Sequence, residues 1–209
     1  MKIIQPSVEV EEFDAIKMLC KIEKAGRTCY KSESKITPDS AEKFIRNIIR
    51  RGHESVLEHE KISTRIICDR GVTHELVRHR CASYSQESTR YVSYKEGIEV
   101  IDPCFWKQGT LCRFNWIQAM LHAEASYKKL IERGASPQEA RTVLPNSLKT
   151  EVVVTMNLRA WRNFFELRCP KSAHPQMRQI AFMLLEKMSK KLSVVFDDIV
   201  EEFVDGTRN

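Results

Sequence analysis

The sequence predicts an α/β protein of the α+β type, in which helices flank a mixed or antiparallel central sheet. Both the helical hydrophobic period and the alternating period of strands occur along the chain. The predicted strands do not alternate regularly with the helices, as a parallel wound sheet requires. A chain of 209 residues is long enough for one sizeable core. We therefore expect residues 1–209 to form a single domain with a helical part.

The first helices are predicted from apolar side chains at helical spacing. A short strand at Lys2–Gln5 precedes a helix at Glu11–Lys24, which closes near Gly26. The next helix begins at Thr37-Pro38-Asp39, with proline in the first turn, and Gly52 follows its end as a cap. The predicted buried positions are Phe13, Ile16, Leu19, Cys20 and Glu23 in the first helix, and Ala41, Phe44, Ile45, Ile48 and Ile49 in the second.

The middle of the chain contains the clearest strand pattern. Between His59 and Asp69, the residues Ile62, Thr64 and Ile66 alternate with Lys61, Ser63 and Arg65. This two-residue period is typical of a half-buried strand. Val72–Val77 is expected to form a short helix, and Tyr91–Tyr94 a further strand.

The second half of the chain is mostly helical in pattern. A long helix is predicted at Phe114–Arg133, a capping box at Ser136–Glu139 starts a short helix, and the valine-rich segment Glu151–Leu158 predicts a strand. Three helices follow, at Arg159–Arg168, Gln176–Leu192 and Val194–Val204. The expected inward side chains are Ile117, Leu121, Tyr127 (or Ala125), Leu130 and Ile131 in the long helix, and Trp161, Phe164, Phe165 and Leu167 in the first of the three.

Composition narrows the class of protein. No apolar run approaches the roughly 20 residues that span a bilayer, and the N-terminus lacks a signal-peptide core, so we expect a cytoplasmic protein without membrane partners. The seven cysteines form no Cys-x-x-Cys pair, which predicts free thiols and no metal site. The net charge of +6 is compatible with nucleic acid or with small phosphorylated ligands.

The most informative segment is Arg78–Tyr91. It holds three arginines, a histidine, three serines and two tyrosines within fourteen residues. Guanidiniums offer forked donors that fit phosphate or carboxylate oxygens, and serines with backbone amides can complete an anion cradle. An isolated Arg-His-Arg tripeptide is more often a solvated loop, but the neighbouring aromatics and hydroxyls favour a ligand site.

Three further polar clusters follow helix or strand ends. Arg51–His59 holds two histidines and two carboxylates, without the spacing of a zinc protease helix, and a polar loop is the simpler interpretation. Arg141–Pro145 contains an arginine that could equally be an ion-pair partner. Asn157–Arg168 puts Arg159 and Asn163 on one helix face, although arginine at a helix end also compensates the helix dipole. Cys81 lacks a base, which favours a quiet thiol.

Together, these residues resemble the flavin-dependent thymidylate synthase family. Arg78-His79-Arg80, then Ser88 and Arg90-Tyr91 resemble its signature, and the other clusters follow in the family's order. The matching segments are Gly52-His53-Glu54-Ser55 with Glu58-His59, Ala140-Arg141-Thr142-Val143-Leu144-Pro145, and Asn157-Leu158-Arg159 with Asn163 and Leu167-Arg168.

The resemblance implies an activity and its partners. The family makes dTMP from dUMP, takes carbon from 5,10-methylenetetrahydrofolate and a hydride from reduced FAD, and uses NADPH to reduce the FAD again. Its members are homotetramers whose active sites draw residues from several subunits. The expected partners of this chain are therefore dUMP, folate, NADPH and three further copies of itself, and no nucleic acid.

The resemblance also implies roles for individual residues. The catalytic residues would be Arg168, placed over the uracil where it can stabilise developing negative charge, with His53 and Ser88. FAD would be bound by Ser55, Glu58, Arg78, His79, Arg80, Asn157, Leu158, Arg159 and Asn163, with Ser55 and His53 coming from another subunit. The nucleotide would be bound by Glu75, Arg78, Gln86, Glu87, Ser88, Thr89, Arg90, Arg141 and Arg168.

The chain departs from the family pattern at three acidic or amide positions. Ser85 stands where asparagine is usual, Gln86 where an acidic residue is common, and Glu75 where glutamine is frequent. A carboxylate near a nucleotide phosphate is unfavourable unless it bonds the sugar or an arginine. Two alternatives to the synthase are a basic nucleic-acid-binding module and a flavin reductase that performs no methyl transfer.

Overall fold

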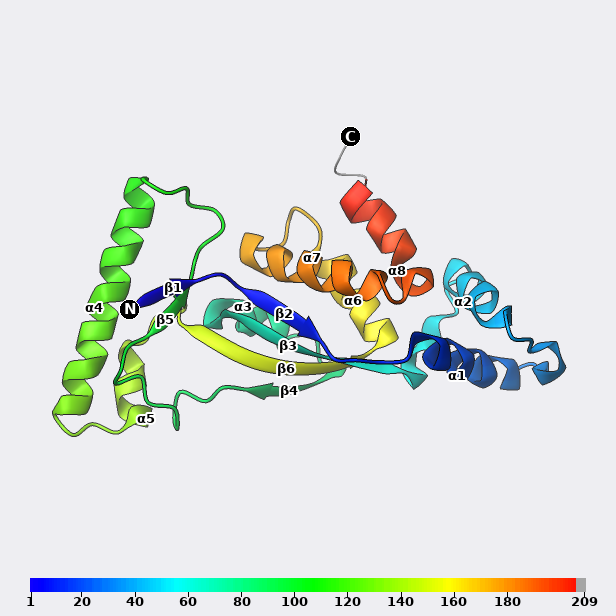
Figure 1. Ribbon diagram of the computed structural model, residues 1–209, viewed down its shortest axis with the longest axis horizontal. Coiled ribbons are helices and arrows are strands. Elements are labelled where there is room, and N and C mark those ends of the chain that lie inside the picture. Colours follow the sequence, from blue (N-terminus) through cyan, green and yellow to red (C-terminus); the bar gives the residue numbers. More distant parts are fainter. Residues whose placement is uncertain (206–209) are drawn as a thin grey trace.

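A four-stranded antiparallel sheet forms the centre of the molecule in the computed structural model, which describes residues 1–205 (Figure 1). The strand order is β2-β3-β6-β4, and the central pair β3 and β6 is the longest. The strands are β2 (Ser7–Val10), β3 (Lys61–Asp69), β4 (Ala82–Gln86) and β6 (Lys149–Asn157). The expected class, helices flanking an antiparallel or mixed sheet, is confirmed.

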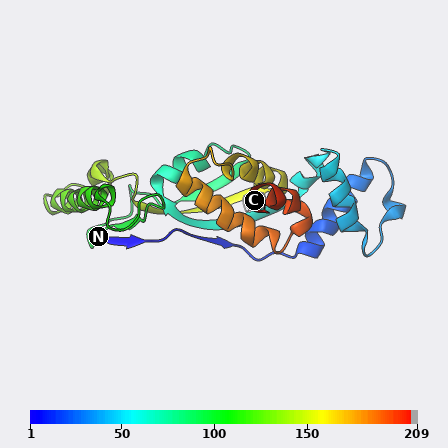
Figure 2. The same cartoon turned by 90° about the horizontal axis from the view of Figure 1, so that it is seen from above.

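One face of the sheet is buried because the strands alternate apolar and polar side chains. Ile62, Ile66, Val152 and Val154 are each at most 2% exposed. Helices α6 (Leu158–Arg168), α7 (Pro175–Ser189) and α8 (Ser193–Val200) lie over this face in both views (Figures 1 and 2). Helix α3 (Arg70–Leu76) adds Val72 and Leu76 to the same core, and a π-turn, η4 (Glu201–Asp205), follows α8. The opposite face is polar, with Ser63 and Thr155 hydroxyls 2.8 Å apart.

Helices also extend the molecule at both ends of the sheet (Figures 1 and 2). At one end lie α1 (Ala15–Thr28), η1 (Glu33–Lys35), α2 (Ser40–Arg50) and η2 (Glu54–His59). At the other end lie α4 (Leu111–Glu132), α5 (Pro137–Ala140) and η3 (Arg141–Val143), beside the parallel strands β1 (Lys2–Ile4) and β5 (Glu99–Ile101). This end has its own apolar cluster, centred on Val100, Trp116 and Met120.

Several local signals are confirmed. Ser136 and Glu139 form the predicted capping box at the start of α5. Gly52 has a φ of 69°, the left-handed conformation that favours glycine after a helix. The pattern in His59–Asp69 corresponds to β3, where Ile62, Thr64, Ile66 and Cys68 are buried.

The predicted strand at Tyr91–Tyr94 is wrong, because this segment is a turn followed by irregular chain after β4. Instead β4 lies inside the basic segment, where no strand was predicted. Ser83 and Ser85 face solvent and Tyr84 is half-buried, so this edge strand lacks an apolar alternation. Its pairing with β6 therefore comes from tertiary structure rather than from local propensity. The strands β2 and β5 were not predicted either.

Several predicted helix faces are wrong in phase. Ile16 is 75% exposed, and Cys20 is exposed too, because α1 turns Met18 and Ile22 inward, beside Leu19 and Glu23, which are buried as predicted. Gly26 lies inside α1 rather than at its end, where a Cβ would stand 2.5 Å from the Phe44 ring. The other wrongly placed inward residues are Leu121 and Leu167, which are 40% and 55% exposed, while Trp116 and Met120 are buried instead.

The last two observations on the fold concern the cysteines and the length and polarity of the helices. All seven cysteines are free, with Cys68 and Cys169 buried. Within residues 1–205, no helix combines the length and apolar character needed to cross a membrane.

The two aspartates that precede α1 and α2 allow a matched test of helix capping. The Asp14 side chain accepts a hydrogen bond from the Lys17 amide at 2.9 Å, whereas Asp39 makes no such bond. We expect Asp14→Ala to lower the free energy of unfolding by about 1 kcal/mol, measured by urea titration. Asp39→Ala removes the same charge at the same helix position and should cost less than about 0.5 kcal/mol. Equal losses would contradict the capping role of Asp14.

Candidate functional site

A cleft of about 520 Å³ brings together residues from three distant segments. Eight of its lining residues are among those expected to bind flavin or substrate. They are Glu58 of η2, Arg78, His79 and Arg80 after α3, and Asn157, Arg159, Asn163 and Arg168 at or within α6. Cys81, Ala160 and Leu167 also line the cleft.

Local hydrogen bonds place the segments that line this cleft. Asn157 caps α6 by accepting from the Ala160 amide at 2.8 Å, which sets the phase of the helix. The Tyr84 hydroxyl lies 2.8 Å from the carbonyl oxygens of both Leu76 and His79. It thereby fixes the turn that carries Arg78. Burial raises the pKa of Tyr84 to about 12, so the hydroxyl remains a donor.

The Arg168 guanidinium is oriented by two partners. Its Nη1 donates to the Glu75 carboxylate at 2.8 Å, and its Nε donates to His79 Nε2 at 3.0 Å. The Arg168 side chain is 17% exposed. The unusual carboxylate at position 75 is therefore bonded to an arginine, which removes the electrostatic objection to a carboxylate near an anion.

His79 is neutral in this arrangement. Its Nε2 accepts from Arg168, which requires an unprotonated nitrogen, and its ring meets Phe164 edge-on with centroids 5.0 Å apart. Burial and, to a lesser degree, the Arg168 charge lower the pKa of His79 to about 4.

The electrostatics of the cleft favour an anion. Four guanidiniums line it, those of Arg78, Arg80, Arg159 and Arg168, against the single carboxylate of Glu58. Glu58 pairs with Arg159 at 2.6 Å on the exposed rim. The surplus of forked donors suits phosphate oxygens.

A second cavity, of about 740 Å³, adjoins the first through Arg159, which lines both. It contains His53 and Ser55, which the resemblance assigns to a different subunit from Arg78-His79-Arg80. Its other walls come from α1, η1 and α2, and include Arg27, Tyr30, Lys35 and Arg51. These residues were missed, because their only signal was polar character near helix ends.

A buried arginine holds the His53–Ser55 segment in place. Arg162, only 3% exposed, donates to Glu54 at 3.1 Å and to both carboxylate oxygens of Asp198 at 2.8 and 2.6 Å. Its Nη1 also donates to the Val195 carbonyl at 2.5 Å. Helices α6 and α8 are thus tied to η2 through one guanidinium.

The remaining nucleotide-binding candidates lie beyond the other end of β4. Ser88, Thr89 and Arg90 follow this strand, and Arg141 Nη1 donates to the Thr89 hydroxyl at 3.4 Å. Gln86 donates to the Thr73 and Thr150 hydroxyls at 3.1 and 3.2 Å. None of these residues lines the cleft that contains Arg168.

Strand β4 therefore divides the basic segment into two halves. Arg80 precedes the strand and Ser88 follows it. At roughly 3.3 Å per residue, the two positions are separated by at most roughly 26 Å. The two halves of the basic segment therefore lie at opposite ends of β4.

The side chains of two other predicted site residues are already engaged in contacts within the chain. Leu158 is fully buried in the main core, so only its backbone could contact a ligand. The Glu87 carboxylate bonds the Tyr94 hydroxyl and the Lys149 ammonium, at 2.6 and 2.8 Å. Cys81 is exposed at the cleft and lacks a described base partner.

Comparison with known proteins decides the family. A family model described as thymidylate synthase complementing protein matches residues 17–192. A flavin-dependent thymidylate synthase from Mycobacterium tuberculosis is 38% identical over 205 residues, covering 89% of this chain and 82% of the relative. The chain belongs to the flavin-dependent thymidylate synthase family. Another family member, from Pyrococcus furiosus, is 39% identical over 171 residues, covering 79% of this chain and 70% of the relative.

Solved structures share the fold. The UMP/dUMP methylase PolB from Streptomyces cacaoi, bound with 5-Br dUMP, superposes with a TM-score of 0.79 at 23% identity over 97% of this chain and 98% of that one. Thymidylate synthase X from Helicobacter pylori, with FAD and dUMP, gives a TM-score of 0.75 at 24% identity over 93% of this chain and 99% of that one. The flavin-dependent thymidylate synthase fold thus extends over nearly the whole chain.

The low pKa of His79 predicts a specific acid sensitivity. The folded-state pKa, about 4, lies below the ordinary 6.5, so the unfolded chain takes up the proton first as pH falls. Stability from this site is therefore present above about pH 6.5 and lost as pH falls towards about 4. In His79→Gln, the amide oxygen can still accept from Arg168 but does not titrate.

We expect the Tm of the wild-type protein to fall more steeply than that of His79→Gln across this pH range, measured by calorimetry. His122→Gln, which removes an exposed imidazole from α4, is the matched control and should follow the wild type. Parallel curves for wild type and His79→Gln would show that His79 is not held neutral by the fold.

Proposed function

We propose that this chain makes dTMP from dUMP by reductive methylation, with 5,10-methylenetetrahydrofolate as carbon donor and reduced FAD as hydride donor. NADPH is the reductant that recharges the FAD. The observation that carries the proposal is the convergence of four guanidiniums on one cleft in a chain of this family. The H. pylori neighbour was solved with FAD and dUMP, and the S. cacaoi neighbour with 5-Br dUMP, which supports the same ligand classes here.

The two adjoining cavities fit FAD. A dinucleotide has two ring systems joined by a diphosphate, and the cavities of about 520 and 740 Å³ meet at an arginine. Both cavities lie in one chain, so this placement takes His53 and Ser55 from the same subunit as Arg78, unlike the expectation from the resemblance. We assign the diphosphate and flavin to the donors of Arg78, Arg80, Arg159 and the asparagines, where forked N–H groups match phosphate oxygens. Bound FAD supplies the redox chemistry, while these residues bind it and set the local field.

Arg168 is assigned the main catalytic role. Glu75 and His79 hold its guanidinium in one orientation at the cleft. A preorganised cation beside the pyrimidine stabilises negative charge as C5 becomes nucleophilic, without reorganisation during the reaction. His79 is neutral, so it adds no second positive charge beside Arg168. It accepts a hydrogen bond from Arg168 and, together with Glu75, orients the guanidinium.

The nucleotide cradle comes from the other half of the basic segment. Ser88, Thr89, Arg90 and Arg141 offer hydroxyl and guanidinium donors for the phosphate and sugar of dUMP. Since strand β4 separates this half from Arg78–Arg80 of the cleft, we propose that the cradle of one subunit faces the cleft of another. A homotetramer with shared active sites satisfies this requirement.

The alternatives predict different behaviour. A nucleic-acid-binding module would use a continuous basic face and bind in a strongly salt-dependent manner without flavin. The arginines here converge on a cleft instead. A flavin reductase without methyl transfer would have no need of the cradle at Ser88–Arg90 and Arg141.

The decisive experiment follows flavin and substrate together. Purified protein should take up FAD with the yellow absorption of a bound flavin, and should release the C5 hydrogen of labelled dUMP only when folate and NADPH are both present. Failure to bind FAD would refute the proposal. Flavin reduction by NADPH without any C5 hydrogen release would favour the reductase.

Arg141→Ala sharpens this test. We expect it to weaken dUMP binding roughly tenfold or more while FAD stays bound. Arg133→Ala removes the same charge from the exposed end of α4 and is the matched control. Unchanged dUMP affinity in Arg141→Ala would remove this arginine from the cradle.

Shared active sites predict complementation between two inactive variants. Arg90→Ala damages the cradle and Arg168→Ala damages the cleft. If each site takes these residues from different subunits, co-expressed variants assemble randomly, and about a quarter of the sites contain both arginines. Turnover should recover to about that fraction of wild type, measured as C5 hydrogen release.

The control pair is Arg159→Ala with Arg168→Ala. Both arginines belong to α6 and line the same cleft. Mixing these two variants should recover nothing, because every cleft then lacks one of them. An absence of recovery in the first pair as well would place Arg90 and Arg168 in sites built from one chain.

A further inference from the structure

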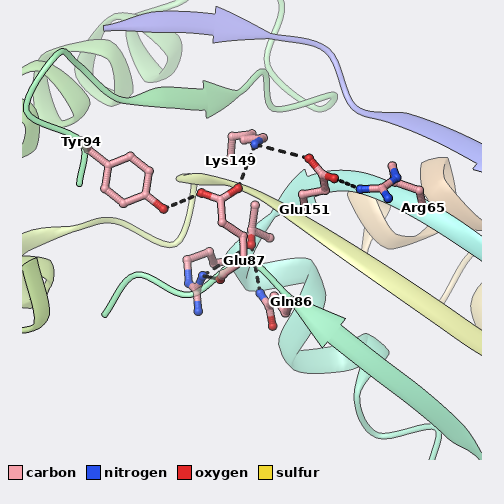
Figure 3. A network of polar contacts seen from close by, with 8 residues as sticks. Arg65, Gln86, Glu87, Tyr94, Lys149 and Glu151 are labelled. Atoms are coloured by element: carbon pink, nitrogen blue, oxygen red, sulfur yellow. Dashed lines mark hydrogen bonds and ion pairs between the residues drawn. The ribbon is translucent and has the colours of Figure 1, made fainter. Parts of the chain in front are cut away.

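A chain of polar contacts runs across the sheet beside the cradle, and Glu87 is at its centre (Figure 3). Its carboxylate accepts from the Tyr94 hydroxyl at 2.6 Å and from the Lys149 ammonium at 2.8 Å. Lys149 also lies 3.9 Å from Glu151, which pairs with Arg65 of β3. The Glu87 side chain is only 16% exposed, so these bonds are well shielded from solvent.

Glu87 is also fixed through its backbone. Its amide donates to the Glu151 carbonyl at 2.8 Å, and its own carbonyl accepts from Arg70 at 3.3 Å. Tyr94 is fixed in turn by Tyr127, whose hydroxyl accepts from the Tyr94 amide at 3.3 Å and whose ring packs edge-on against it. The bond between the two side chains therefore closes a loop whose ends are anchored to β6 and α4.

The closed loop carries the proposed cradle. Inside it, the amides of Tyr91 and Val92 donate to the Ser88 carbonyl at 3.2 and 3.0 Å, and the Arg90 amide donates to the Ser88 hydroxyl at 3.3 Å. Thr89 is 5% exposed and bonded to Arg141. This turn thus lies within the loop that the Glu87–Tyr94 bond closes.

The Glu87 carboxylate is fully occupied by its own chain. Each oxygen has a donor, and the adjacent ammonium compensates its charge. Burial and the bond to Glu87 raise the pKa of the Tyr94 phenol above its ordinary value, so the hydroxyl remains a donor. Both oxygens are thus already used to hold the surrounding chain in place.

We propose that Glu87 is a positioning residue: by joining Tyr94 to Lys149, it holds Ser88, Thr89 and Arg90 in the conformation that receives the phosphate of dUMP. This rests on the proposed function of the cradle. In this proposal Glu87 supports the nucleotide-binding loop and does not itself contact the nucleotide.

The direction in which Glu87→Gln changes the affinity for dUMP distinguishes a positioning role from a purely electrostatic one. If Glu87 acted only through its negative charge, Glu87→Gln would remove repulsion and tighten the binding of anionic dUMP. If it positions the loop, the same variant has one acceptor oxygen in place of two, cannot accept from both Tyr94 and Lys149, and weakens dUMP binding by roughly tenfold. Tyr94→Phe removes only a hydroxyl and should weaken binding in the same direction.

The experiment uses the FAD-loaded protein. The dUMP dissociation constant is measured from the change in flavin absorbance, and KM and kcat from C5 hydrogen release. We expect Glu87→Gln and Tyr94→Phe to raise the dissociation constant and KM for dUMP, while kcat at saturating dUMP and FAD affinity stay within about twofold of wild type. The double variant should be no weaker than the weaker single variant, because both changes open the same closure.

Glu96→Gln is the matched control, since this glutamate lies in the same region with a side chain that is 90% exposed. It should leave dUMP binding unchanged. Tighter or equal binding in Glu87→Gln, or fully additive losses in the double variant, would overturn the positioning role. If wild-type protein fails to bind dUMP, the proposed function fails as well. If only the variants depart from expectation, the positioning role alone is lost.

Discussion

The antiparallel pairing of β3 with β6 is the constraint on which the candidate site depends. Lys61 pairs with Asn157 at one end of this ladder, and Asp69 with Lys149 at the other. Asn157 caps the helix that carries Arg168, while Asp69 accepts from the Val72 amide at 2.7 Å and so caps α3, which leads to Arg78.

A slip of one residue in that register would turn the buried side chains of the slipped strand outward. The same slip would shift both caps relative to each other. The apolar alternation that stabilises the sheet therefore also sets the distance between the cleft and the loop held by Lys149. Core packing and site geometry are consequences of one hydrogen-bonded ladder.

Sequence patterns predicted the elements whose own residues carry the signal. β3 shows alternation, and α5 has a capping box, so both are recognisable without tertiary context. β4 is different, because Ser83, Ser85 and Gln86 have little strand propensity, and their pairing depends on β6. The phase error in α1 has a similar cause: Leu19 and Glu23 are buried as predicted, but packing against α2 and η2 also buries Met18 and Ile22 in place of Ile16 and Cys20.

The cleft residues were predictable by type, but their grouping was not. Arginines, histidine and asparagines at helix ends indicated an anion site, and seven of them line one cleft together with Glu58. The basic segment looked continuous in sequence, whereas a strand divides it in space. The carboxylates were hardest to assign, since Glu75 and Glu87 owe their roles to Arg168 and Lys149, which lie far along the chain.

Arg162 gives the C-terminal helix an influence on a cavity that it does not line. Its guanidinium keeps its charge at any physiological pH, and Asp198 of α8 supplies most of the compensation. Shortening the chain ahead of Asp198 would remove the bidentate partner of a buried cation and leave Glu54 as its hydrogen-bonded carboxylate. The tolerance of this protein to C-terminal trimming is thus limited by charge balance as well as by the lost packing of Ile199.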